Sequence, residues 1–370
     1  MNYIYSALTI IAPLIILSFI GVRLLVPKII AYAFNNNLTD KPNDRKVHHN
    51  AIPRLGGIAF GGTLLLIFTG YVILDGSLGS LATLIALSLI FITGLMDDIK
   101  EIKAKKKFVI QIVAAVIIAS EGIRITHLWG LFGINELSIF YQYVITVIIL
   151  VGITNSFNLI DGIDGLAAGI GLINSFALGC MAFYASFTEI AVLNFTLAGG
   201  LFAFLFFNFN PAKIFMGDSG STLIGFLMGV SALYLATHHE SFQTINVPIA
   251  MFGILLLPVF DTIRILVERI IRGVSPFTAE KNHIHHLLLE TGLNHKKSSI
   301  ILYISNILII IFSMFIQQIV SMTDAIILTF TFGILLFEAC TIKNILYSKK
   351  TRLKNMLNLI ELERENTLIK

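Results

Sequence analysis

Long apolar runs recur along the whole of this 370-residue chain. A helix needs about 20 apolar residues to cross the hydrocarbon core of a bilayer, and eleven runs approach that length. Inside a bilayer, helices satisfy all of their backbone hydrogen bonds internally. Charged residues make up only 13% of the chain, compared with about 25% in ordinary soluble domains. The sequence therefore predicts an all-α, polytopic integral membrane protein.

The predicted spans cover most of the chain and leave no separate soluble domain. They run over 3–25, 56–74, 80–96, 108–120, 139–157, 165–188, 190–207, 219–237, 246–260, 299–322 and 325–342. The fourth and ninth are the shortest. The first lacks a charged start and a small-residue cleavage site, so we expect it to be a retained span and not a signal peptide.

The distribution of lysine and arginine predicts the orientation of the spans, because cytoplasmic loops are enriched in these residues. If the N-terminus lies outside and each run crosses once, every Lys and Arg except Arg124 falls on one side. This predicts an outer N-terminus, a cytoplasmic C-terminus, one transmembrane domain over 1–348 and a charged cytoplasmic tail over 349–370. The net charge of +4 then reflects orientation and contact with anionic membrane lipid, and nucleic-acid binding is not expected.

Two adjacent aspartates, Asp97 and Asp98, stand where the third run ends. Neighbouring carboxylates repel each other, so this pair favours a bound metal ion or another cationic partner. The alternative is a solvated pair at the membrane interface beside the lysines that follow, because charged residues at the ends of spans are ordinary.

Four oxygen-bearing side chains, Asn155, Asn158, Asp161 and Asp164, follow one another at every third residue after the fifth run. On a helix this step keeps neighbours in one row but turns the row by about 60° each time, so adjacent members can share a ligand. All four converge only if the helix unwinds, which Gly162 permits. A polar turn between spans would not need two amides and two carboxylates, so we interpret this segment as functional.

A glycine-flanked aspartate, Asp218, stands at the start of the eighth run, after a segment that contains Asn208 and Phe215. Free backbone N–H groups at a helix start can bind phosphate and, with a carboxylate, a bridging cation. The Gly-Asp-Ser-Gly sequence is neither a serine-protease nucleophile region, because it leads into a membrane helix, nor a P-loop, because no Gly-Lys-Ser/Thr follows. The alternative is a helix cap with small residues for packing.

The longest inner loop, expected over 261–295, carries Arg264 and the histidines His283, His285 and His286. Three histidines in four residues can bind zinc, but such a site usually takes a further ligand at a defined spacing. Phosphate contacts fit the accompanying arginines better. A solvated basic loop or a helix on the membrane surface is the alternative.

Together these segments predict phosphoryl transfer at the inner membrane face. Carboxylate and amide oxygens suit Mg²⁺, which also keeps water and substrate phosphates in its shell. Phosphoryl transfer depends mainly on positioning and on charge neutralisation, which the surrounding cations supply. Because the groups lie at the ends of spans, we expect one substrate from water and the other from the bilayer. A cation- or proton-coupled transporter is the alternative, although transporter sites lie near the midplane.

Five segments, in order, resemble those of one enzyme family: DKPNDRKVHHNAIPRLGG, GLMDDIKE, NSFNLIDGIDGLAAG, FNFNPAKIFMGDSGST and PFTAEKNHIHH. They are similar to the polyprenyl-phosphate N-acetylhexosamine-1-phosphate transferases, the WecA/TagO-like branch of glycosyltransferase family 4 that is related to MraY. The first segment and the histidine cluster resemble the N-acetylglucosamine-type enzymes more than the phospho-N-acetylmuramoyl-pentapeptide transferase, whose activity is the alternative.

The resemblance implies that undecaprenyl phosphate attacks the sugar-bearing phosphorus of a UDP-N-acetylhexosamine, with UDP-GlcNAc favoured. The products would be a lipid-diphosphate-sugar and UMP, in the first membrane step of cell-envelope glycan synthesis. It also implies a Mg²⁺ cofactor, with Mn²⁺ as the alternative ion, and an active site on the cytoplasmic side of the inner (plasma) membrane. The sugar, the pathway, a one-step or two-step mechanism and a homodimer stay open.

The resemblance finally implies a role for each candidate residue. The catalytic residues are expected to be Asp97, Asp98, Asp161 and His283, with Asp97 as the base toward the lipid phosphate. The metal ligands are expected to be Asn158 and Asp218. The substrate-binding residues are expected to be Lys107, Asn155, Asp164, Asn208, Phe215, Arg264, His285 and His286. Within this set, the ring of Phe215 would stack on uridine.

Overall fold

The computed structural model describes residues 2–40, 51–75, 77–242, 244–275 and 283–339. In these ranges the chain is almost entirely helical, and the two-residue strands β1 (Thr39–Asp40) and β2 (Ile52–Pro53) form one short antiparallel pair. The prediction of an all-α polytopic protein is confirmed. Most of the first inner loop, the residues just before the histidines and the predicted tail over 349–370 lie outside the described residues.

A helix occupies each of the predicted spans, and ten of the helices are long and apolar enough to cross a membrane. The helices are α1 (Asn2–Asn35), α2 (Gly56–Asp75), α3 (Leu78–Ile99), α4 (Ala104–Ser120), α5 (Ile139–Ile160), α6 (Leu166–Tyr184), α7 (Thr188–Asn208), α8 (Asp218–Thr237), α9 (Val247–Ile271), α10 (Ile284–Glu290), α11 (His295–Ile316) and a last helix over Met322–Ala339, with short 3-10 helices η1 (Leu131–Gly133) and η2 (His239–Ser241).

The fourth predicted span, α4, has only 17 residues, but the segment from its first turn to Arg124 contacts both ends of α8. Lys107 in its first turn contacts Asp218 at the start of α8. Just beyond its end, the carbonyl of Arg124 accepts a hydrogen bond of 3.1 Å from the hydroxyl of Thr237 at the end of α8. A 20-residue helix such as α8 is about 30 Å long, which matches the hydrocarbon thickness. These contacts support the prediction that α4 is an eleventh crossing, beside the ten helices that are long enough by themselves.

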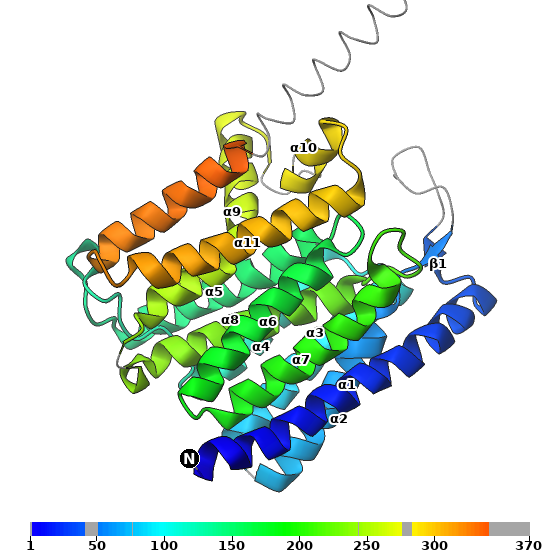
Figure 1. Cartoon of the computed structure of the whole chain (residues 1–370), viewed down its shortest axis with the longest axis horizontal. Helices are drawn as coiled ribbons and strands as arrows, with labels where there is room; N and C mark the ends of the chain where they lie inside the picture. The colour runs from blue at the N-terminus through cyan, green and yellow to red at the C-terminus, as the bar shows by residue number, and fades with distance from the viewer. Residues whose placement is uncertain (1, 41–50, 76, 243, 276–282, 340–370) are drawn as a thin grey trace, which may run out of the picture.

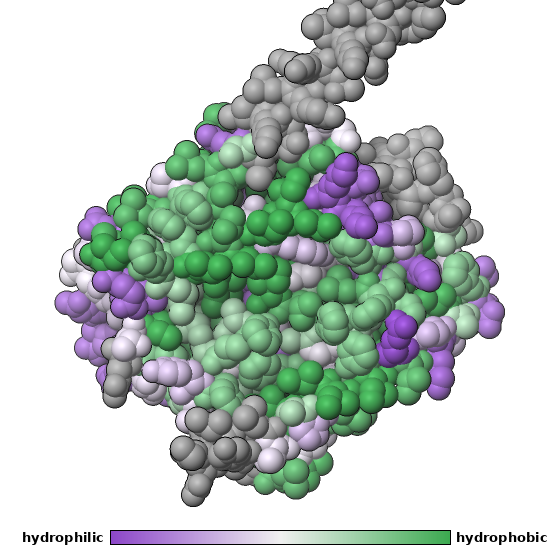
Figure 2. Space-filling model, in the orientation of Figure 1, coloured by the Kyte–Doolittle hydropathy of each residue, from purple (hydrophilic) through white to green (hydrophobic). Residues whose placement is uncertain are grey.

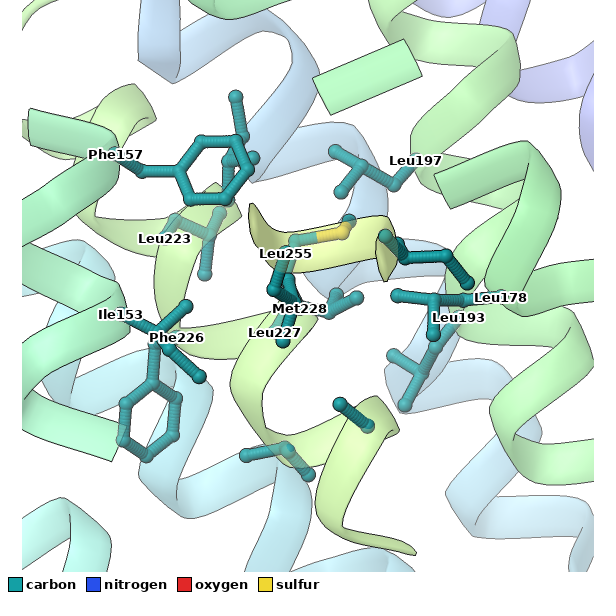
Figure 3. Packing of buried hydrophobic residues seen from close by; sticks show 14 of the residues in the cluster. Ile153, Phe157, Leu178, Leu193, Leu197, Leu223, Phe226, Leu227, Met228 and Leu255 are labelled. Carbon is teal, nitrogen blue, oxygen red and sulfur yellow. The ribbon is translucent and has the colours of Figure 1, made fainter. Parts of the chain in front are cut away.

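The central element of the bundle is α8, which is 89% buried over its apolar stretch, more than any other of the ten long helices. It packs against α2, α3, α5 and α6. Apolar side chains from α5, α6, α7 and α9 surround it (Figure 3). The labelled members of this core are Ile153, Phe157, Leu178, Leu193, Leu197, Leu223, Phe226, Leu227, Met228 and Leu255.

Glycines allow α3 and α5 to approach α8 closely. A Cβ on Gly94 of α3 would lie 2.5 Å from Cα of Ser219, and one on Gly225 of α8 would lie 2.8 Å from Cα of Thr154. Helices in lipid gain little from the hydrophobic effect when they associate, so close packing through small residues holds them together. These contacts fix the ends of α3 and α5, which carry the polar residues of interest.

The ninth helix is longer than predicted, because α9 runs to Ile271 and the expected loop from Asp261 onward begins only after it. Arg264 forms ion pairs with Asp261 at 3.0 Å and with Glu268 at 2.7 Å. Pairs at these helical spacings support a helix beyond its apolar stretch. Asp261 and Arg264 therefore lie on a helix and not in a loop.

The helices run alongside one another across the view, and α10 and β1 lie toward the same end of the bundle (Figure 1). The visible surface over the middle of the helices is largely apolar, while hydrophilic residues gather toward the ends (Figure 2). This distribution is the one expected of a bundle with a lipid-facing belt.

Candidate active site

The end of α3 and the starts of α4 and α8 bring together three carboxylates and one ammonium group, Asp97, Asp98, Asp218 and Lys107, which we call the acidic centre. Nζ of Lys107 lies 3.0 Å from Oδ2 of Asp97 and 2.7 Å from Oδ2 of Asp218. Oδ1 of Asp97 accepts a hydrogen bond of 2.8 Å from the backbone N–H of Ile102. The ammonium group thus offsets part of the repulsion between carboxylates from two different helices.

Asp98 caps the N-terminus of α8 from the neighbouring helix α3. Its Oδ1 accepts the N–H of Asp218 at 2.7 Å, and its Oδ2 accepts the N–H and the hydroxyl of Ser219 at 3.0 and 2.5 Å. The first N–H groups of a helix lack partners within the helix, and a negative charge is favourable there. Asp98 therefore holds the start of α8, while Asp97 faces the ammonium group.

The end of α5 adds Asn158 and Asp161 to this region. Nδ2 of Asn158 donates to the hydroxyl of Ser221 at 3.1 Å, one turn beyond Asp218. The carboxyl of Asp161 receives no hydrogen bond from the described residues and keeps partial contact with solvent. Burial, followed by the charges of nearby carboxylates with Asp218 first, raises the pKa of Asp161 to about 7. Asp161 thus lies close enough to the acidic centre to respond to its charge.

Asp164 links the turn between α5 and α6 to two other segments. Its Oδ2 accepts hydrogen bonds from Nδ2 of Asn210 at 2.8 Å and from the N–H of Ala212 at 3.1 Å. Its Oδ1 lies 3.3 Å from Nδ1 of His295 in α11. Burial alone would raise the pKa of Asp164, but His295 and the other donors outweigh it and hold the pKa below its ordinary value. In this arrangement Asp164 positions the chain around the site.

Three further predicted substrate-binding residues also make contacts within the protein. Nδ2 of Asn155 donates to Oε1 of Gln111 in α4 at 2.8 Å. Asn208 is only 2% exposed, and its Nδ2 donates to the carbonyl of Ile214 at 2.9 Å, which closes the segment before α8. Phe215 is partly exposed, and its backbone pairs with residues at β2 and the start of α2. Of these three, the Phe215 ring fits best the stacking role that the resemblance implies.

Asp261 is the centre of a second group, the histidine cluster, which comprises Asp261, Arg264, His283, His285 and His286. Asp261 is 1% exposed, and its Oδ2 lies 2.9 Å from Nδ1 of His283. Its Oδ1 accepts the N–H of Ile284 and contacts Nη2 of Arg264, both at 3.0 Å. The C-terminal half of α9 therefore holds the start of α10 through the buried carboxylate of Asp261.

His285 joins the histidine cluster to the turn after α5. Its ring stacks on that of His283, with 5.6 Å between the centroids, and packs directly against Gly162, beside Asp161. The ring is 1% exposed, and neither of its nitrogens has a hydrogen-bond partner among the residues that the structure describes. Burial, together with the charge of His286, lowers the pKa of His285 to about 3, so the ring is neutral at pH 7.

The donor atoms fit Mg²⁺ better than Zn²⁺. In the part of the chain that the structure describes, no three His, Cys, Asp or Glu side chains are grouped so that they could hold an ion by themselves. Asn158 contacts Ser221, one turn along α8 from Asp218, so the end of α5 and the start of α8 offer one amide and one carboxylate. Mg²⁺ typically takes one or two carboxylates and completes its shell with water and phosphate oxygens. The three histidines show no zinc-binding arrangement with the other described residues.

Three residues that the sequence analysis did not select, Gln111, Asp261 and His295, contact predicted site residues. An aspartate followed by Arg264 at i+3 and by a glutamate at i+7 was a local signal for a helix at Asp261. The other two had no local signal, because Gln111 lies 44 residues from its partner Asn155 and His295 lies 131 residues from its partner Asp164. Only the packing of the helices brings them to the site.

Comparisons with known proteins show to which family the chain belongs. The family model described as "Glycosyl transferase family 4" matches residues 80–236. The probable undecaprenyl-phosphate N-acetylglucosaminyl 1-phosphate transferase of Bacillus subtilis (strain 168) is 33% identical over 291 residues, which are 78% of this chain and 80% of the relative.

Two further relatives show the same pattern. The decaprenyl-phosphate N-acetylglucosaminephosphotransferase of Mycolicibacterium smegmatis is 33% identical over 71% of each chain. The undecaprenyl-phosphate alpha-N-acetylglucosaminyl 1-phosphate transferase of Yersinia pestis is 29% identical over 83% of this chain and 85% of its own. With this identity over most of both chains, the protein belongs to glycosyl transferase family 4.

Proposed function

We propose that the protein transfers N-acetylglucosamine 1-phosphate from UDP-GlcNAc to undecaprenyl phosphate and releases UMP, at the cytoplasmic side of the inner (plasma) membrane. A phosphate oxygen of the lipid would form a bond to the sugar-bearing phosphorus, and the bond from that phosphorus to the UMP oxygen would break. The names of the relatives support the acceptor and the sugar. Membership in a transferase family leaves the transporter hypothesis without support.

The observation that carries this proposal is the acidic centre. Lys107 bridges Asp97 and Asp218 from separate helices, at 3.0 and 2.7 Å. The start of α8, held by Asp98, lies beside them. Cations and helix N-termini stabilise the charge on a transferring phosphoryl group. All of these groups are at the ends of membrane helices, where a soluble nucleotide and a lipid phosphate can meet.

On the acceptor side, Asp97 orients the lipid phosphate and accepts its proton if the phosphate arrives protonated. Lys107 lies within 3.0 Å of the Asp97 carboxylate and can move from it to a phosphate oxygen. Asp98 acts differently, because its three hydrogen bonds hold the start of α8, and with it Asp218, in place. Asp97 is therefore the base in this proposal, and Asp98 is a positioning residue.

On the donor side, Asp218 and Asn158 would hold Mg²⁺, and Asp161 would lie beside them. Bound Mg²⁺ would neutralise the diphosphate and make UMP a better leaving group. Phe215 stacks on the uracil ring, and Arg264, His283 and His286 contact the diphosphate and the sugar. His285 supports their arrangement through its packing on the turn at Gly162.

The test is a donor screen with the purified full-length protein in detergent, undecaprenyl phosphate and Mg²⁺. Radiolabelled UDP-GlcNAc is expected to give a lipid-extractable product and UMP in equal amounts, and chelation of the metal is expected to stop both. UDP-GalNAc and UDP-MurNAc-pentapeptide serve as comparison donors. Transfer from UDP-MurNAc-pentapeptide alone would replace the proposed donor, and no transfer from any of the three would refute the activity.

A further inference from the structure

One face of α11 contacts the turn between α5 and α6. The hydroxyl of Ser299 donates to the carbonyl of Asp164 at 3.0 Å, and the hydroxyl of Tyr303 donates to the carbonyl of Gly165 at 2.5 Å. Nδ1 of His295 lies 3.3 Å from the carboxylate of Asp164. The three side chains are spaced by four residues, so they stand in one row along the helix. This row reaches the turn and not the acidic centre itself.

The turn needs such support, because its backbone is irregular. Five residues separate the end of α5 at Ile160 from the start of α6 at Leu166, and Gly165 has a φ of 76°. The carbonyl of Asp164 lies outside both helices and accepts the hydroxyl of Ser299, while the carbonyl of Gly165 accepts the N–H of Gly169 at 2.8 Å and also the hydroxyl of Tyr303. The Tyr303 ring also fills the space beside Gly169, where a Cβ would overlap it. The same row of α11 side chains thus contacts both the backbone of the turn and the start of α6.

We infer that His295, Ser299 and Tyr303 of α11 are positioning residues for transfer, because they hold the turn that carries Asp161 toward the acidic centre. None of the three belongs to the carboxylate, amide or histidine groups described above. The inference rests on the proposed function. A displacement of reacting groups by about 1 Å can cost roughly 100-fold in rate, so loss of two backbone contacts is expected to act on turnover.

The experiment compares a Ser299→Ala/Tyr303→Phe double variant with Asn306→Ala as a matched control. Asn306 lies further along α11, is fully buried and donates to Oδ1 of Asn174 in α6 at 2.7 Å. Both variants therefore weaken the packing of α11 on α6, but only the double variant releases the turn. Measurements are kcat, both KM values, the Tm in detergent and deuterium exchange of the 160–169 segment.

For the double variant we expect kcat to fall by about tenfold to 100-fold, KM for the nucleotide sugar to stay within about threefold, and exchange at 161–166 to become faster. For Asn306→Ala we expect a comparable fall in Tm, with kcat within about twofold and unchanged exchange in the turn.

Two results would overturn the inference. The first is a fall in kcat that is proportional to the fall in Tm in both variants, and the second is unchanged deuterium exchange of the turn in the double variant. The exchange measurement requires no substrate. If the wild-type protein transfers no sugar at all, the proposed function fails. The exchange measurement still shows whether α11 stabilises the turn.

Discussion

Asp97 and Asp98 are identical neighbours that differ only in their partners. Asp97 meets the ammonium group of Lys107 at 3.0 Å, whereas Asp98 accepts three hydrogen bonds from the start of α8. In the proposed function, the Lys107 ammonium group can turn to a substrate phosphate, which leaves the Asp97 carboxylate available to the substrate. A carboxylate engaged by three protein donors is not, so the two positions should respond differently to the same substitution.

We predict that Asp97→Asn lowers kcat by about 100-fold or more and leaves Tm nearly unchanged, because it removes the base but keeps the acceptor for Ile102. Asp98→Asn places an amide N–H₂ against N–H donors, so it should reduce the free energy of unfolding by about 1–2 kcal/mol. Initial rates and thermal unfolding in detergent check both. Equal changes in Tm for the two variants would contradict the division of roles.

The raised pKa of Asp161 predicts a dependence of stability on pH. Its pKa is 3.8 in the unfolded chain and about 7 in the folded protein, because burial and neighbouring carboxylates disfavour the charged form. The folded state is therefore progressively destabilised as pH rises from about 4 to about 7. In EDTA, Asp161→Asn should unfold at a higher temperature than the wild type at pH 8, and this difference should shrink toward pH 5.

The same thermal unfolding series with added Mg²⁺ tests the proposed ion. A divalent cation near Asp161 stabilises its carboxylate, so Mg²⁺ should reduce the advantage of Asp161→Asn at pH 8. A difference in Tm that does not change with pH would contradict the origin assigned to the pKa shift.

At the scale of elements, the site depends on how closely α3 lies against α8. Gly94 is one turn before Asp97, and a Cβ there would lie 2.5 Å from Cα of Ser219 and 2.6 Å from the carbonyl oxygen of Asp218. Both neighbours are backbone atoms that cannot rotate away. A larger residue must therefore separate the two helices at the point where their aspartates meet.

We predict that Gly94→Ala lowers the free energy of unfolding by about 1–3 kcal/mol and reduces kcat at least tenfold, because overpacking moves α3 away from α8. Gly152→Ala on α5 is the matched control, since a Cβ there meets no atom within 4 Å. Tm and initial rates measure both effects. Normal activity in Gly94→Ala would show that the close approach of α3 is not needed.

At the scale of the whole molecule, the acidic centre and Arg124 lie at opposite ends of α8, as eleven crossings require. Lys107 and Arg124 mark the two ends of α4, against the start and the end of α8. The positive-inside rule predicts that the lysine-rich end faces the cytoplasm. In the proposed function, this orientation would give the site access to a nucleotide sugar.

The orientation can be tested with single cysteines in a background in which Cys180 and Cys340 are replaced by serine. Lys105→Cys and Glu240→Cys introduce exposed thiols near the two ends. A membrane-impermeant maleimide should label position 240 in right-side-out vesicles and position 105 in inside-out vesicles. The reverse pattern would place the site on the outer side, and labelling of both positions in one kind of vesicle would contradict eleven crossings.

Most of the fold was predictable from the sequence, because a bilayer imposes a fixed length on each span. The apolar runs that predicted eleven spans all became helices, including the short run at α4. The continuation of α9 beyond Phe260 was not predicted, because ion pairs and not hydropathy sustain it. For the site, the sequence predicted which segments carry oxygen-bearing side chains, because each of these motifs consists of residues that are close together in the chain.

The sequence by itself determined the membrane class, the spans and the family, because hydropathy, charge and motifs are read along the chain. Only the tertiary structure decided what each polar side chain contacts. That Asp98 caps α8, that Asn155 meets Gln111 and that α11 holds the turn after Ile160 all depend on residues far apart in sequence. The physical reason is that such contacts arise from helix packing, which glycines at a few crossing points set and which no local pattern encodes.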